Sequence, residues 1–208
     1  MFSIPNNFRT FSREMLNVKV FSTTGEMGRA AAAEVAAKLV ELLGKKEEVN
    51  MIFAAAPSQE AFLNSLIADS RIDWTRINAF HMDEYIGVGP SAPQSFAHFL
   101  RERIFDRVPF RSVYCLDGLA SDRDAECARY AGLLQRYPVD IVCMGIGENG
   151  HIAFNDPDVA DFNDPKLVKV VALDPVCRQQ QVNEVVAALG LSALRRARNA
   201  AAVQGFVQ

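Results

Sequence analysis

The 208-residue chain has no long hydrophobic run and no extended basic tract. No apolar stretch approaches the roughly 20 residues that a membrane-spanning helix requires. The segment 1–10 also lacks the apolar centre and cleavage pattern of a signal peptide. The formal net charge is −3, whereas proteins that bind nucleic acids concentrate lysine and arginine against the phosphate backbone. We therefore expect a cytoplasmic protein that has neither a membrane nor a nucleic acid as its partner.

Cysteine is scarce, and its spacing does not favour a metal site. Cys115, Cys127, Cys143 and Cys177 form no C-x-x-C pair, which is the pattern typical of zinc sites. Disulfides are also rare in the cytoplasm. We expect reduced thiols and no bound metal.

The order of the apolar segments predicts an α/β protein. Half of the residues are hydrophobic and 23% are charged, as in soluble globular domains. Apolar runs with β-forming residues alternate with segments of helical periodicity, which favours an open, mostly parallel sheet with helices on both faces. Strands are expected at 16–22, 49–55, 77–81, 113–116, 139–144 and 166–173, and helices at 23–43, 58–68, 95–107 and 122–137. The Ala/Arg-rich tail 185–208 has a composition that is compatible with a helix and differs from everything upstream.

Polar residues follow three of the predicted strands. Ser58 comes after the second strand, Asp83 and Glu84 after the third, and His151 and Asp156 after the fifth. Ligands of open α/β sheets bind outside the carboxyl ends of the strands. If the strands are parallel, these side chains meet at one edge of the sheet.

Asp83 and Glu84 are candidates for a base and for the residue that holds its loop. Neighbouring side chains of an extended segment point in opposite directions, so one carboxylate can face a ligand while the other faces the protein. A carboxylate whose pKa is raised by burial is a suitable base for a proton next to a carbonyl group. The alternative is that both are solvated acids of a loop.

The loop after the strand at 139–144 carries glycines at 145, 147 and 150, followed by His151 and Asp156. A histidine can transfer a proton near neutral pH, and an acid beside it can fix its tautomer; the alternative is a histidine that only binds backbone groups. The glycine spacing also fits the dinucleotide fingerprint, but that motif needs a helix at the third glycine. Pro157 disfavours a helix there, so we expect no nucleotide cofactor.

Two segments resemble the signatures of the glucosamine-6-phosphate deaminase/isomerase family, to whose superfamily the 6-phosphogluconolactonases also belong. They are Phe80-His-Met-Asp-Glu-Tyr-Ile-Gly87 and Gly145-Ile-Gly-Glu-Asn-Gly-His-Ile-Ala-Phe-Asn-Asp-Pro157, and the similarity runs from about residue 18 to 183. The resemblance implies a Rossmann-like fold and a cofactor-free aldose–ketose isomerisation of glucosamine 6-phosphate to fructose 6-phosphate with loss of ammonia.

The resemblance also implies roles for individual residues. Asp83 would take the C2 proton of a phosphorylated amino sugar, and His151 would open the sugar ring. Asp156 and Asn149 would orient the imidazole of His151. The substrate would be bound by Ser58, Gln59, Glu84, Gly147 and Arg178. Ser58 would act at a helix start, where backbone N–H groups favour a phosphate, although an ordinary helix cap is the alternative.

The sequence departs from the family pattern at four places. Asn149 stands where many members have Asp, Asp156 replaces the usual Glu, and Ala54-Ala-Ala-Pro-Ser-Gln59 replaces the glycine- and threonine-rich phosphate turn. The resemblance ends near residue 183, so we expect an incomplete domain at 1–183, without the family's C-terminal elements, and an atypical tail at 184–208. A truncated or frame-shifted reading of a longer gene would give this pattern and a weakened phosphate site.

Three functions remain open at this point. The first is the deamination, the second is a lactonase-type hydrolysis in which His151 activates water, and the third is non-catalytic binding of a sugar phosphate. An exposed sheet edge would also favour a homo-oligomer.

Overall fold

The computed structural model describes residues 9–13, 16–147, 149–173, 175 and 201–205. Two residues singled out above, Cys177 and Arg178, lie outside these ranges, as does most of the tail. No helix in the described ranges is both long and apolar enough to cross a membrane.

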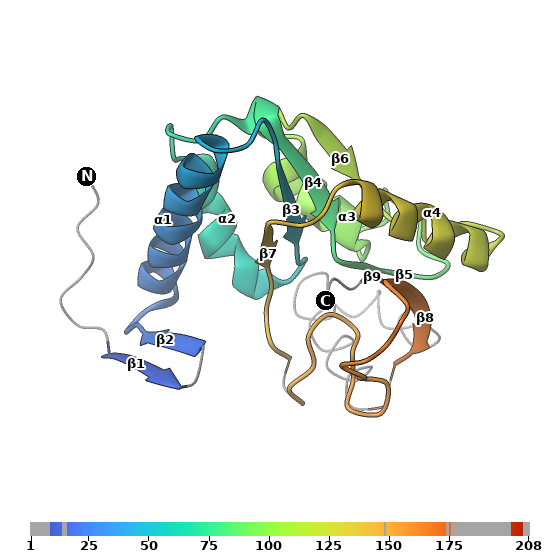
Figure 1. Cartoon of the computed structure of the whole chain (residues 1–208). Coiled ribbons are helices and arrows are strands. Elements are labelled where there is room, and N and C mark those ends of the chain that lie inside the picture. Colours follow the sequence, from blue (N-terminus) through green and yellow to red (C-terminus); the bar gives the residue numbers. More distant parts are fainter. Residues whose placement is uncertain (1–8, 14–15, 148, 174, 176–200, 206–208) are drawn as a thin grey trace.

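A four-stranded parallel sheet forms the centre of the fold (Figure 1). Its order is β6 (Ser112–Tyr114), β4 (Ile77–His81), β3 (Val49–Phe53) and β7 (Ile141–Cys143). All residues of the two central strands are buried, as expected for parallel strands covered on both faces. In register, Phe53 lies opposite His81 on one side and Cys143 on the other, so these three strands end at the same edge.

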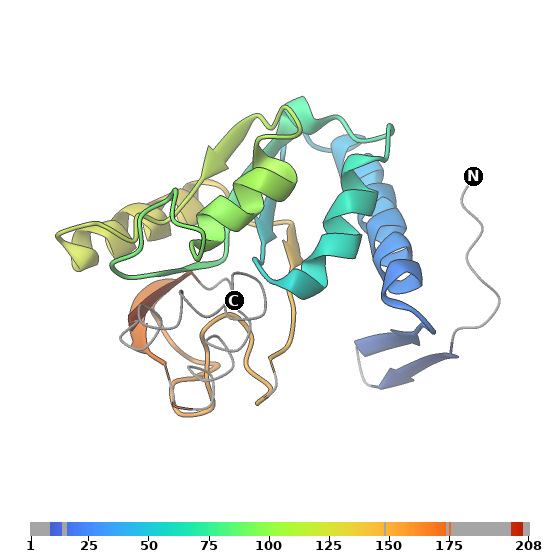
Figure 2. The same ribbon diagram turned by 180° about the vertical axis from the view of Figure 1, so that it is seen from behind.

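Helices cover both faces of this sheet (Figures 1 and 2), as the sequence predicts. One face packs against α1 (Thr24–Leu43), α2 (Glu60–Ile67), α3 (Phe96–Leu100) and the π-helical turn Arg101–Phe105 that continues α3. The other face packs against α4 (Arg123–Arg136). The two cores follow the alternation of side chains along a strand.

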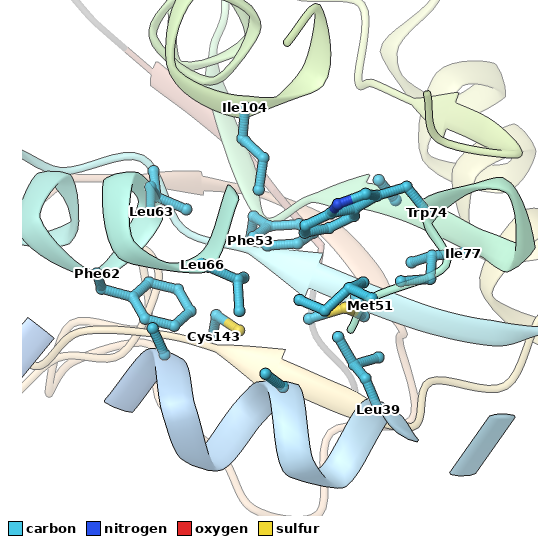
Figure 3. Close-up of a cluster of buried hydrophobic side chains, with 14 of the residues drawn as sticks. Leu39, Met51, Phe53, Phe62, Leu63, Leu66, Trp74, Ile77, Ile104 and Cys143 are labelled. Carbon is cyan, nitrogen blue, oxygen red and sulfur yellow. The ribbon is translucent and has the colours of Figure 1, made fainter. Parts of the chain in front are cut away.

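The larger core shows this alternation at β3 and β4. Met51 and Phe53 pack with Leu39 of α1 and Ile104 of the π-helical turn (Figure 3), whereas Ile52 faces the smaller core below α4. Burying an aliphatic or aromatic side chain completely contributes roughly 1.5–3 kcal/mol. The two cores therefore fix the strands that carry the candidate site.

Three of the helices begin within one residue of their predicted starts, and α2 begins two residues later than expected. Thr23, Ser95 and Asp122 each accept a hydrogen bond from a backbone N–H group in the first turn of α1, α3 and α4. Ser58 does not cap α2: it lies inside a 3₁₀ turn, Pro57–Gln59, that runs directly into the helix. The chain therefore begins this helix with Pro57, whose fixed φ suits a first turn.

Two smaller sheets were not expected. The predicted strand at 16–22 is present as β2 (Leu16–Val20), but it pairs antiparallel with β1 (Arg9–Arg13) and not with the central sheet. The short strand β5 (Asp83–Tyr85) belongs to an antiparallel sheet with β9 (Ala201–Gly205) and β8 (Val168–Ala172).

The tail, whose composition is compatible with a helix, contains the strand β9 at 201–205. Residues 201–205 lie between β5 and β8 and pair with both. A segment with strands on both sides must be extended, because a helix satisfies its own backbone groups and leaves its neighbours unpaired. The remainder of the tail lies outside the described residues.

Candidate active site

A cavity of about 360 Å³ lies at the carboxyl edge of the central sheet. Ser58, Asp83 and His151 all line it, from the segments that follow β3, β4 and β7. The volume falls in the range of small-molecule sites. The structure thus brings one carboxyl group, one imidazole and one hydroxyl group around a common space, as expected from parallel strands that end together.

Asp83 begins β5 directly beyond the end of β4. The residue is only 6% exposed, and its backbone carbonyl oxygen is in hydrogen-bond contact with Nε2 of the buried His81. Burial raises the pKa of the Asp83 carboxyl group to about 8, and the nearby charge of Glu84 adds to this effect. A carboxyl group with this pKa can exchange a proton near neutral pH.

Glu84 points away from the cavity, which corrects its assignment to substrate binding. It is buried and does not line the cavity. Its carboxylate accepts hydrogen bonds from the hydroxyl group of Ser95 and from the backbone N–H groups of Tyr85, Phe96 and Ala97. The two adjacent acids therefore point in opposite directions, and Glu84 holds the start of α3.

His151 is oriented by two other residues of its loop. Its Nδ1 lies 2.5 Å from Oδ1 of Asn149 and 3.4 Å from Oδ1 of Asp156. The side-chain amide of Asn149 donates to Asp156 over 3.0 Å, so its oxygen faces the imidazole. This arrangement assigns the ring proton to Nδ1 and leaves the lone pair on Nε2. Asn149 thus lies between the acid and the histidine and contacts both.

Gly147 makes room for the imidazole. A Cβ atom added at this position would overlap the ring of His151, and the backbone N–H of Gly147 donates to the carbonyl oxygen of His151 over 2.9 Å. The loop then turns through Gly150, at φ 85°, and Ala153, at φ 53°, and an isolated bridge joins Ile152 to Asn155. No helix begins at the third glycine, so the loop lacks the structure of a dinucleotide-binding turn.

Replacing Gly147 with alanine is expected to displace His151. The new methyl group would push the imidazole out of its contact with Asn149, and a misplacement of about 1 Å lowers a reaction rate by roughly 10²-fold. The loss would be measured as a lower steady-state rate of the reaction that the cavity catalyses. Gly132→Ala is a suitable control because no atom lies within 4 Å of a Cβ added there, and equal activity of the two variants would contradict the expectation.

The turn after β3 supplies one hydroxyl group to the cavity. Ser58 lines the cavity together with Ala54, Ala55 and Ala56. Gln59 does not line it, although its side-chain nitrogen lies 3.5 Å from a Cβ placed on Gly145. No lysine or arginine of the described ranges lines this cavity.

Aromatic residues that the sequence did not single out form one wall. Phe96 and Phe154 line the cavity, and their rings stack with centroids 5.7 Å apart. Tyr85 packs against both, at 4.8 and 5.5 Å. Phe154 lies within the signature segment at 145–157, but only the fold shows that α3 brings Phe96 to it.

Comparison with known proteins places the chain in a family. The profile described as "Glucosamine-6-phosphate isomerases/6-phosphogluconolactonase" matches residues 22–204. The chain belongs to this family. The match extends beyond residue 183, where the visible resemblance of the sequence ends, and it includes most of β9.

Within the glucosamine-6-phosphate isomerase/6-phosphogluconolactonase family, the chain is 35% identical over 164 residues to a glucosamine-6-phosphate deaminase of Bacillus cereus and to one of Bacillus thuringiensis. These matches cover 79% of the chain and 60% of each relative, so the chain spans about 60% of the length of these curated relatives.

Solved structures share the same fold. A monomeric glucosamine-6-phosphate deaminase superposes with a TM-score of 0.76 at 26% identity, covering 89% of this chain and 74% of that one. A 6-phosphogluconolactonase from Shewanella baltica superposes with a TM-score of 0.70 at 16% identity, covering 89% and 72%. The second likeness is one of fold alone.

Proposed function

We propose that this protein isomerises and deaminates an amino-sugar phosphate, converting glucosamine 6-phosphate to fructose 6-phosphate and ammonia. The observation that carries the proposal is that Asp83 and His151 line one cavity of sugar size. The base and the proton shuttle of such a reaction must reach the same substrate, because they act on neighbouring carbon and oxygen atoms.

In this proposal His151 opens the sugar ring. The lone pair on Nε2 accepts the proton of the C1 hydroxyl group, and the imidazole returns it to the ring oxygen as the C1–O5 bond breaks. Asn149 and Asp156 hold the ring and its tautomer during this transfer. The product is the open-chain aldehyde, whose C2 proton is acidic.

Asp83 then acts as the base. Its ionised carboxylate takes the C2 proton, which leaves an enolamine between C1 and C2. Protonation of C1 gives an imine at C2, and addition of one water releases ammonia and leaves the ketose phosphate. The raised pKa of Asp83 makes its carboxylate a stronger base than an exposed aspartate.

The phosphate group would lie near Ser58. Its hydroxyl group lines the cavity at the start of the helical run formed by Pro57–Gln59 and α2, and backbone N–H groups at a helix start favour an anion. Ser58 is therefore the proposed phosphate ligand. Gln59 follows it in the same turn and is a second proposed ligand. Arg178, the third, lies outside the described residues.

Two observations favour deamination over lactone hydrolysis. The relatives that are 35% identical are named glucosamine-6-phosphate deaminases, whereas the lactonase likeness is 16% identical and concerns the fold. In addition, hydrolysis of a lactone requires no base at a carbon atom, so it would leave the buried Asp83 without a role.

The decisive measurement compares two reactions of the purified chain. Ammonia and fructose 6-phosphate should appear in equal amounts from glucosamine 6-phosphate, while 6-phosphogluconolactone should hydrolyse no faster than it does in buffer. Lactone hydrolysis without ammonia release would replace the proposal with the lactonase. Binding of glucosamine 6-phosphate in a calorimeter without either reaction would instead indicate a non-catalytic sugar-phosphate-binding protein.

A further inference from the structure

Behind the cavity lies a buried group of polar side chains that the proposed reaction does not use. Glu84 is 1% exposed and accepts four hydrogen bonds, three of them from Ser95, Phe96 and Ala97 at the start of α3. The distances lie between 2.7 and 3.2 Å. A carboxylate at a helix start is favoured by the partial positive charge there.

A second buried side chain, His81, contacts the backbone of Asp83. His81 contacts the carbonyl oxygen of Asp83 through Nε2, and its Nδ1 accepts a hydrogen bond from the backbone N–H of Leu116 over 3.4 Å. Nε2 of His81 lies 3.9 Å from a carboxylate oxygen of Glu84. The backbone carbonyl group of Asp83 is thus held by His81 of β4, and the next backbone N–H but one, that of Tyr85, is held by Glu84.

Resting on the function proposed above, we propose that Glu84 is a positioning residue for Asp83. It fixes the strand that carries the base to the helix that carries Phe96, and it places its own negative charge beside the base. Phe96 donates its backbone N–H to Glu84 and turns its ring into the cavity, so one side chain sets the relative position of the cavity's acid and of its aromatic wall.

The charge of Glu84 acts in the same direction as burial. Both raise the pKa of Asp83. Of the other titratable groups nearby, His81 has its pKa lowered by burial and therefore stays neutral, Arg101 lies on the π-helical turn, and Cys115 follows β6. His151 lines the same cavity as Asp83. Glu84 is the negative charge that shifts the pKa of Asp83.

The pH dependence of kcat/KM separates this role from a purely structural one. Asp83 must be ionised to accept a proton, so kcat/KM of the wild type should rise with pH and level off above a midpoint near 8. In Glu84→Gln the negative charge is gone, so the midpoint should fall by about one unit, a tenfold change in the ionisation equilibrium. A structural role alone would lower the melting temperature and leave the midpoint in place.

A second variant separates charge from geometry. Glu84→Asp keeps the charge but is one methylene group shorter, so it should lose contacts at α3 and lower kcat roughly tenfold while the midpoint stays near 8. Glu41→Gln, which removes an exposed acid from α1, is the control for a change of net charge and should match the wild type. An unmoved midpoint in Glu84→Gln, or full kcat in Glu84→Asp, would overturn the proposal.

Two further measurements apply if Glu84→Gln does not fold or if the wild type shows no turnover. If Glu84→Gln does not fold, Ser95→Ala removes one hydrogen bond to Glu84 and should lower kcat without moving the midpoint; unchanged kcat would refute the positioning role. If the wild type shows no turnover, the proposed function fails. Titration of ¹³C-labelled Asp83 by NMR, in the wild type and in Glu84→Gln, then still decides whether Glu84 acts on it.

Discussion

Replacing Asp83 with asparagine is expected to lower kcat for ammonia release from glucosamine 6-phosphate by about 10²- to 10⁴-fold. Asparagine fits the same space but cannot accept the C2 proton, and the remaining contacts of the segment involve the backbone carbonyl group of residue 83. Substrate binding should therefore persist. A coupled assay for ammonia and a calorimetric titration with glucosamine 6-phosphate measure the two quantities separately.

The stability of the same variant is its control. The folded pKa of Asp83, about 8, exceeds the unfolded value, so the wild type loses stability as the pH rises from about 4 to 8 and loses no more above that. Asparagine removes this loss, and the melting temperature of the variant should exceed that of the wild type by an amount that grows from pH 5 to pH 8. A variant that is inactive because it is unfolded would show the opposite, and turnover within threefold of the wild type would exclude Asp83 as the base.

Replacing His151 with glutamine is expected to lower kcat by roughly 10²-fold or more. Glutamine can still form a hydrogen bond at the position of the imidazole, but it cannot carry a proton from the C1 hydroxyl group to the ring oxygen. The variant should nevertheless bind an acyclic amino-alditol phosphate as the wild type does, because that compound has no ring to open. Steady-state turnover of glucosamine 6-phosphate and calorimetric binding of the acyclic compound should be measured for both the variant and the wild type.

A histidine outside the cavity serves as the matched control. His98 lies on α3, where it faces Glu102 at 3.4 Å, so His98→Gln should retain full turnover. If His151→Gln lost affinity for the acyclic compound to the same extent as turnover, the imidazole would only shape the cavity, and ring opening would have to be assigned elsewhere.

Asparagine at position 149 gives this site a different chain of hydrogen bonds from one made of two acids. Its amide donates to Asp156 and its oxygen faces Nδ1 of His151, so a neutral group links the carboxylate to the imidazole. The second departure from the family pattern, Asp156, is compatible with this arrangement because it contacts both partners. The shorter acid thus still reaches the imidazole, at 3.4 Å.

The sequence by itself determined the central part of the fold and the residues that meet at its edge. The short, mainly apolar runs at β3 and β4 favour strands buried on both faces. Each strand carries one asparagine, and Asn78 donates to Asn50 over 2.9 Å, so both amides are buried with a partner. The helices predicted at 23–43 and 122–137 are present as α1 and α4, whose first turns are capped by Thr23 and Asp122. Because the strands are parallel, the segments that follow β4 and β7 lie at the same edge of the sheet, and these segments carry Asp83 and His151.

Only the tertiary structure decided which way each acid points and which strands pair outside the central sheet. Asp83 and Glu84 are adjacent carboxylates, and the packing of α3 against β5 determines which of them is buried at a helix start and which lines the cavity. β9 likewise has an alanine-rich sequence with little preference for a strand, yet it pairs with β5 and β8. Both choices depend on residues that are distant in the chain. An unpaired backbone edge and a buried charge without donors both cost free energy, and this cost outweighs the local preference of the segment.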